Sequence, residues 1–147
     1  MKTYSKNIIL LSLIGFVSVL GFGCKKSQKE ELTNQMINAS GDTISKGTFV
    51  TIDHETKGNA AILKKSDGSR VVQFYNYYST PAPNIDIFLS KKSTYTTAAE
   101  CPRLGDLTNI GSFNYTVPAG INSDDYPYVV SWCVDYSALM GYALLKK

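Results

Sequence analysis

Apolar and polar residues alternate with a period of two along most of the chain after residue 46. In residues 47–54 (G-T-F-V-T-I-D-H), for example, Val50 and Ile52 share one register and Phe49 lies on the other. Such alternation predicts β-strands, because successive side chains of a strand point to opposite faces of a sheet. The same kind of pattern recurs, between turn residues, in segments 59–65, 70–78, 84–90, 104–111, 112–118, 127–136 and 138–145. The sequence therefore predicts an all-β domain, an antiparallel β-sandwich of about eight short strands.

The first residues have a different pattern. Lys2 and Lys6 precede an almost wholly apolar run, 8–22, which is shorter than the roughly 20 residues of a membrane-spanning helix and has the length of a signal-peptide core. The run ends in L-G-F-G-C, where Cys24 is the final residue, although the leucine lies one position further from the cysteine than in the usual motif. This ending resembles the lipobox of bacterial lipoproteins.

The lipobox resemblance implies that residues 1–23 are a lipoprotein signal peptide and that Cys24, carrying fatty acids such as palmitate, begins the mature chain. We then expect a protein of the bacterial cell envelope, anchored to a membrane through Cys24, with its domain facing the periplasm or the exterior. An uncleaved anchor or an ordinary secreted protein are the alternatives. Residues 25–46 contain no aromatic residue and few apolar ones, so we expect a flexible tether over 24–46 and a single domain over 47–147.

Charge and residue inventory exclude several classes of function. The formal net charge is +3, and loss of Lys2 and Lys6 with the signal peptide would leave +1, so no basic patch argues for nucleic acid. His54 is the only histidine, which excludes a histidine-rich metal site, and no metal site is predicted. The motifs C-x-x-C, G-x-S-x-G, the Walker loop and the dinucleotide fingerprint do not occur. The sequence favours a protein without substrate turnover of its own over an enzyme.

Two cysteines remain in the predicted domain, Cys101 and Cys133. A disulfide between them would close a loop of about thirty residues and stabilise the domain by roughly 4 kcal/mol in the chain-entropy model. If this disulfide does not form, Cys133 is either an unreactive thiol or a site of redox chemistry or ligand binding. In strand 127–136, Trp132 belongs to the more apolar register, which we predict to face the core, and Cys133 shares the more polar register with Ser131.

The tyrosines of F-Y-N-Y-Y (74–78) admit two interpretations. Tyr75, Tyr77 or Tyr78 could stack against a sugar or another flat ligand, or they could be core residues and cross-strand pairs, as most aromatic strand residues are.

Several short segments follow one another in a specific order between residues 47 and 145. They are G-T-F (47–49), H-E-T-K-G (54–58), P-N-I-D-I-F-L-S (83–90), L-G-D-L (104–107), G-S-F-N-Y-T-V-P (111–118), Y-V-V-S-W-C-V-D-Y (128–136) and G-Y-A-L-L (141–145). In this order and spacing they resemble the Skeletor-type electron-transfer domain family (DM thirteen), which is related to the DOMON domains and has a β-sandwich fold.

The resemblance implies electron transfer, with a redox partner protein. The characteristic cysteine of the family falls on Cys133 and would act as a free redox thiol or as the ligand of a prosthetic group such as haem. His54 also falls on a family position and is a candidate second haem ligand, or else a strand-end histidine bonded to a turn. The alternative function is a non-catalytic ligand-, glycan- or protein-binding module with a structural Cys101–Cys133 disulfide.

Overall fold

A computed structural model describes residues 40–108 and 110–147 of the chain. The predicted signal peptide, Cys24 and residues 25–39 of the predicted tether lie outside these described residues. The described part contains one short 3₁₀ helix, η1 (Ser123–Asp125), and the strands β1 (Asp42–Thr51), β2 (Thr56–Lys64), β3 (Arg70–Ser79), β4 (Ile85–Ser90), β5 (Arg103–Asp106), β6 (Gly111–Thr116), β7 (Tyr128–Cys133) and β8 (Ala138–Leu144). Within the described residues, no helix has the length and apolar character that a membrane span requires.

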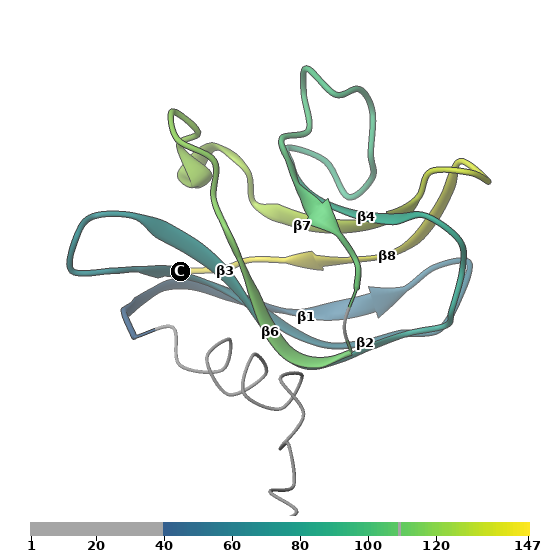
Figure 1. Cartoon of the computed structure of the whole chain (residues 1–147), viewed down its shortest axis with the longest axis horizontal. Helices are drawn as coiled ribbons and strands as arrows, with labels where there is room; N and C mark the ends of the chain where they lie inside the picture. Colours follow the sequence, from purple (N-terminus) through teal and green to yellow (C-terminus); the bar gives the residue numbers. More distant parts are fainter. Residues whose placement is uncertain (1–39, 109) are drawn as a thin grey trace, which may run out of the picture.

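The strands form one antiparallel sheet in the order β5-β4-β7-β8-β1-β2-β3-β6. β1 joins the two halves of the sheet, because residues 42–48 pair with β2 and residues 49–51 pair with β8 (Figure 1). The two halves pack face to face, and the edge strands β5 and β6 approach each other where the Tyr115 hydroxyl donates to the Asp106 carbonyl oxygen at 2.7 Å. The predicted all-β class is confirmed: residues 40–108 and 110–147 form eight strands in one nearly closed sheet.

The first strand begins earlier than the composition indicated. Residues 42–46 pair with residues 61–64 of β2, and Ile44 packs against the core. The folded domain therefore includes residues 42–46, which the sequence analysis assigned to the tether. Backbone pairing with a strong neighbouring strand orders this segment although it contains no aromatic residue.

Inward-facing side chains of both halves form one hydrophobic core. The ring of Phe74 lies at its centre, with ring centroids of Phe113, Tyr77 and Phe49 at 4.7, 5.2 and 5.7 Å. Aliphatic residues from several strands complete it, among them Ile62, Val72, Ile87, Leu89 and Val129. The Tyr77 hydroxyl, buried in this core, donates to Ser131 Oγ at 3.0 Å, so that both polar groups are satisfied.

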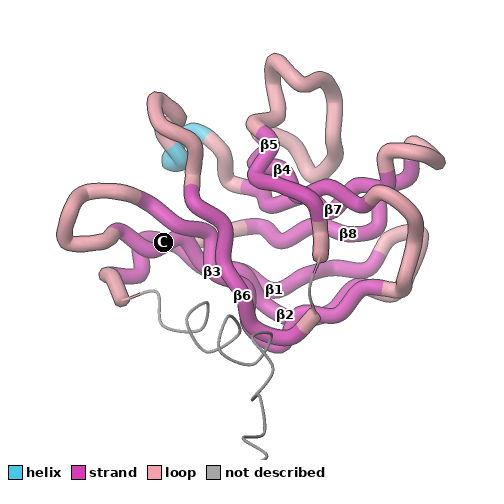
Figure 2. The backbone as a smooth tube through the Cα atoms, in the orientation of Figure 1, coloured by secondary structure: helices cyan, strands magenta, loops and turns pink. Residues whose placement is uncertain are grey.

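The outer face of β4 and β7 carries a second apolar cluster. The 91–102 connection, drawn as a loop in Figure 2, contributes Cys101 and the ring of Tyr95, whose centroid lies 5.3 Å from that of Trp132. Trp132 therefore faces outward under this loop, whereas Ser131 and Cys133 face inward. The prediction that the Trp132 register faces the core is wrong, because aromatic residues that pack beneath a loop give the same apolar pattern as residues of the core.

Gly47 lies just before the point where β1 changes its partner from β2 to β8. A Cβ atom at this position would overlap the backbone carbonyl oxygen of Leu144, so only glycine allows the end of β8 to approach. Just before it, Lys46 and Lys146 exchange both backbone hydrogen bonds, each 2.9 Å long. The end of the chain thus returns beside β1.

Candidate functional site

Cys133 lies at one end of the core, beneath the connection between β3 and β4. It is 1% exposed and packs with Ile85 and Met140. Three partly buried side chains surround this group: Ala82 and Leu107 from two connections, and Ala138 from the start of β8. The thiol donates a hydrogen bond from Sγ to the carbonyl oxygen of Pro83 at 3.0 Å. Cys133 is therefore a buried, hydrogen-bonded thiol instead of a residue of the polar surface.

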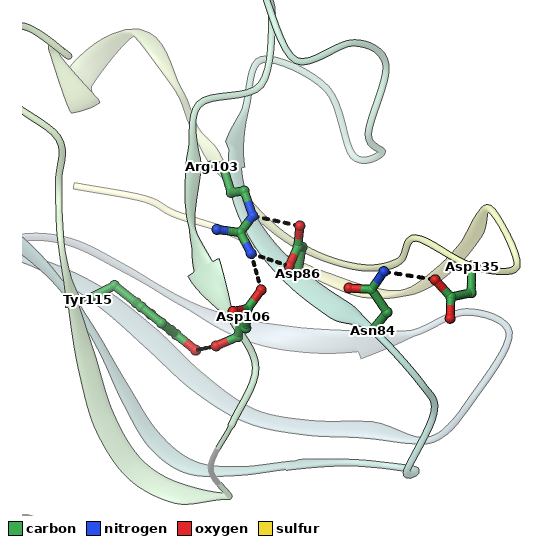
Figure 3. Close-up of polar contacts among 6 residues, drawn as sticks. All are labelled: Asn84, Asp86, Arg103, Asp106, Tyr115 and Asp135. Carbon is green, nitrogen blue, oxygen red and sulfur yellow. Dashed lines mark hydrogen bonds and ion pairs between the residues drawn. The ribbon is translucent and has the colours of Figure 1, made fainter.

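Residues 80–84, which we call the cover segment, are held over Cys133 at one end by the Thr80 amide, which donates to the Glu55 carbonyl oxygen at 2.8 Å, and at the other end by Asn84. This residue has a φ of 52°, in the left-handed region that asparagine tolerates better than most residues. Its side-chain nitrogen donates to Asp135 Oδ1 at 2.7 Å, and the two side chains face each other in Figure 3. Its carbonyl oxygen accepts from the amide of Val134 at 2.9 Å. The cover segment is thereby tied to the turn that follows β7.

Cys101 is the other described thiol, and it belongs to the outer cluster. It is 1% exposed, and its sulfur lies 3.5 Å from Ser90 Oγ and 3.4 Å from Thr96 Oγ1. Burial raises the pKa of this thiol, but hydrogen bonds with Thr96 and Ser90 oppose it, and the pKa falls below its usual value. Cys101 and Cys133 are both free and lie in clusters on opposite faces of the sheet, so the structure does not form the disulfide considered from the sequence.

His54 lies in the connection between β1 and β2, and it is exposed. Its backbone carbonyl accepts a hydrogen bond from Thr56 Oγ1 at 3.1 Å. A haem iron would need open space beside the Cys133 sulfur, but this sulfur is enclosed by the cover segment and by Ile85 and Met140. The residues as arranged do not fit a haem ligated by Cys133.

A charged cluster that the sequence analysis missed lies where β5 meets β4 (Figure 3). Arg103 forms a two-pronged ion pair with Asp86, with Nε–Oδ2 and Nη2–Oδ1 distances of 2.6 and 2.8 Å, and it also contacts Asp106. The hydrogen bond to Asp86 raises the pKa of Arg103, and burial raises the pKa of the adjoining Tyr115 hydroxyl. The signal in the sequence is the lone carboxylate in the apolar segment I-D-I-F-L. The cluster holds the edge strand β5 in place.

The three candidate tyrosines have different environments. Tyr77 is 1% exposed and belongs to the core, which confirms the second interpretation for this residue. Tyr78 is 38% exposed at the end of β3. Tyr75 is half-buried on the outer face of the sheet, where it lines a cavity.

These observations define the class of protein: a small antiparallel β domain that holds an unbonded cysteine under a short connection. In a scan of protein-family models, the family described as Electron transfer DM13 matches residues 48–145. The chain belongs to this family, which confirms the resemblance drawn from the W-C segment and its neighbours, and its fold is an electron-transfer-type β domain. No curated protein and no solved structure matches the chain in the corresponding comparisons.

Proposed function

We propose that this domain passes electrons through the thiol of Cys133, which opening of the cover segment exposes to a redox partner protein. The observation that carries the proposal is the position of Cys133. The cysteine of the W-C segment is unbonded, is 1% exposed, and is covered by a short segment that a few hydrogen bonds hold down. The match to an electron-transfer family supports the same role.

The closed arrangement keeps the sulfur reduced. The thiol of Cys133 donates its hydrogen to the Pro83 carbonyl, and a protonated thiol is a poor nucleophile because the thiolate is the reactive form. Burial among Ile85 and Met140 also keeps oxidants away from the sulfur. When the cover segment opens, the hydrogen bond to Pro83 is lost and the sulfur becomes accessible to a partner disulfide.

The reaction in the open state is thiol–disulfide exchange. The Cys133 thiolate attacks one sulfur of a partner disulfide; a new S–S bond forms, the partner's S–S bond breaks, and its second sulfur leaves as a thiolate that takes up a proton. A donor thiol then attacks the Cys133 sulfur and releases the reduced partner. A second donor thiol attacks the first donor's sulfur, which forms a donor disulfide and restores the Cys133 thiol. Two electrons thus pass from donor thiols to the partner disulfide.

The test is to trap the exchange intermediate with a small disulfide. Reduced protein is incubated with oxidised glutathione, quenched with acid, and digested for mass spectrometry. We expect one glutathione on the Cys133 peptide in the wild type and in Cys101→Ala, and none on the corresponding peptide of Cys133→Ala. Reaction of Cys133 only in unfolded protein, or modification of Cys101 alone, would refute the proposal.

We further propose that the domain works in the bacterial cell envelope as a lipoprotein anchored through Cys24. The basic N-terminal segment, the apolar run 8–22 and the G-C ending of the run support this proposal. Cells that express the chain and are fed an alkyne analogue of palmitate should label it and retain it in the membrane fraction. Cys24→Ala should lose both properties, whereas Cys101→Ala should keep them. Equal labelling of both variants would contradict the anchor.

A further inference from the structure

The outer face of β1 and β2 carries a cavity of about 590 Å³ at the end of the molecule where the chain terminates. This volume lies in the range of roughly 300–1,000 Å³ that is typical of small-molecule sites. Besides Gly47 and two alanines, its walls carry lysines, small polar residues and one tyrosine ring. They include Lys46, Lys146, Lys147, Thr48, Asn59 and Tyr75.

Two lysines on one side of the cavity lie opposite each other in the sheet, an arrangement that destabilises the fold. Lys46 and Lys146 form a mutually hydrogen-bonded antiparallel pair, so their side chains leave the same face of the sheet from Cα atoms about 5.5 Å apart. Like charges directly opposite each other destabilise a sheet. In the part of the chain that the structure describes, neither lysine forms an ion pair, and Lys147 has only a long one, 3.6 Å, with Asp124. This arrangement leaves positive charge available to an anionic ligand.

The opposite side of the cavity offers groups suited to a polyhydroxylated ligand. Thr48 Oγ1 donates to Asn59 Oδ1 at 2.8 Å, and no described residue accepts from the Asn59 side-chain nitrogen. The half-buried ring of Tyr75 lies beside them, with its hydroxyl fixed by a 2.6 Å hydrogen bond to Gln73. A ring, an amide donor and cations together fit a ligand with both a flat hydroxylated body and a negative charge. A free phosphate would use only the cations.

We propose that this cavity binds an acidic saccharide, with a uronate carboxylate on Lys46 and Lys146 and a sugar ring against Tyr75. The site is independent of the redox chemistry, because it lies at the opposite end of β8 from Cys133. Cys133 pairs with Ala138 at the start of that strand, whereas Lys146 follows its end. The saccharide site would position the domain on an acidic polymer of its surroundings while the thiol remains free to react.

Isothermal titration of the purified protein with oligogalacturonate tests the site. We expect saturable binding that weakens as salt is raised, and binding at least about tenfold weaker for the neutral methyl ester and for the double variant Lys46→Gln/Lys146→Gln. The matched control Lys91→Gln/Lys92→Gln removes the same charge from two exposed lysines in the connection between β4 and β5 and should bind as the wild type does. Tyr75→Phe, which keeps the ring, should also bind.

Four results would overturn the proposal. They are no saturable binding of oligogalacturonate, equal affinity for the methyl ester, equal loss of affinity in both double variants, or tighter binding to anionic phospholipid vesicles or inorganic phosphate than to the saccharide. The variants of the cavity leave Cys133 untouched. Failure of this site would therefore not affect glutathione trapping at Cys133, and failure of trapping would not affect saccharide binding.

Discussion

Substitution of Asn84 should loosen the cover segment and expose Cys133 without unfolding the domain. Asn84→Ala removes the 2.7 Å hydrogen bond to Asp135, worth about 1 kcal/mol at an exposed site. Alanine at a φ of 52° also lacks the local side-chain hydrogen bond by which asparagine tolerates the left-handed region, and this strain costs roughly 1 kcal/mol more. The local opening equilibrium should then rise about 30-fold, because each 1.4 kcal/mol is a factor of ten. Asn84→Gly, which tolerates this φ, should raise it only about fivefold.

The assay is the labelling rate of each thiol by a small disulfide reagent under native conditions, resolved by peptide mass spectrometry. Cys101 is an internal control in the same molecule, because it lies on the other face of the sheet. Asn76→Ala is the matched control, since Asn76 also has a left-handed φ, 49°, but belongs to β3 away from the cover segment. Labelling of Cys133 that rises no more than that of Cys101, or that rises equally in Asn76→Ala, would refute local opening.

Three further predictions concern the scaffold and are measured by urea unfolding. Tyr77→Phe and Ser131→Ala should each destabilise the domain by about 1–2 kcal/mol, because each single change leaves a buried hydrogen-bonding partner unsatisfied. The double variant should lose less stability than the sum of the two single variants. Additive effects would contradict a hydrogen bond between the two side chains. Gly47→Ala should lower the free energy of unfolding by about 2–3 kcal/mol, because the new Cβ would overlap the β8 backbone. A neutral effect would contradict the close approach of β8 to Gly47. A hydrogen bond from Arg70 lowers the pKa of Asp124 in the folded domain. The Asp124 carboxylate therefore contributes stability at pH values above its unfolded pKa of about 4, and this contribution is lost as the pH falls through the lower folded pKa. Asp124→Asn should therefore destabilise the domain at pH 7 and not at pH 2; an equal effect at both would contradict the ion pair.

Much of the fold could be predicted from the period of two. Segments such as 70–78 and 138–145 became strands close to their predicted bounds, because alternation and turn residues are local signals. The start of β1 at Asp42 was missed, since that part of the strand is ordered by its pairing with β2, and pairing partners are not local information. The Arg103–Asp86 cluster was missed for the same reason: it exists only because β5 lies beside β4.

The sequence identified Cys133 as the candidate site residue but did not indicate which side chains surround it. The W-C segment singled out Cys133, and alternation correctly placed Trp132 and Cys133 on opposite faces. Which face is the core could not be deduced, because the loop that carries Tyr95 buries the outer aromatic residues almost as well as the core buries the inner ones. The cover segment also depends on a contact between Asn84 and Asp135, 51 positions apart in the sequence, which no spacing rule indicates.

The most direct test of the redox role of Cys133 is a redox titration, in glutathione buffers, of the Cys24→Ala/Cys101→Ala double variant, in which Cys133 is the remaining cysteine. The fraction of protein carrying glutathione is measured by intact mass after acid quenching, from reducing to oxidising conditions and back. We expect one reversible transition with a single glutathione per molecule, and no transition when Cys133→Ala is added. A variant that stays unmodified across the whole range while it remains folded would contradict the proposal that this sulfur carries electrons.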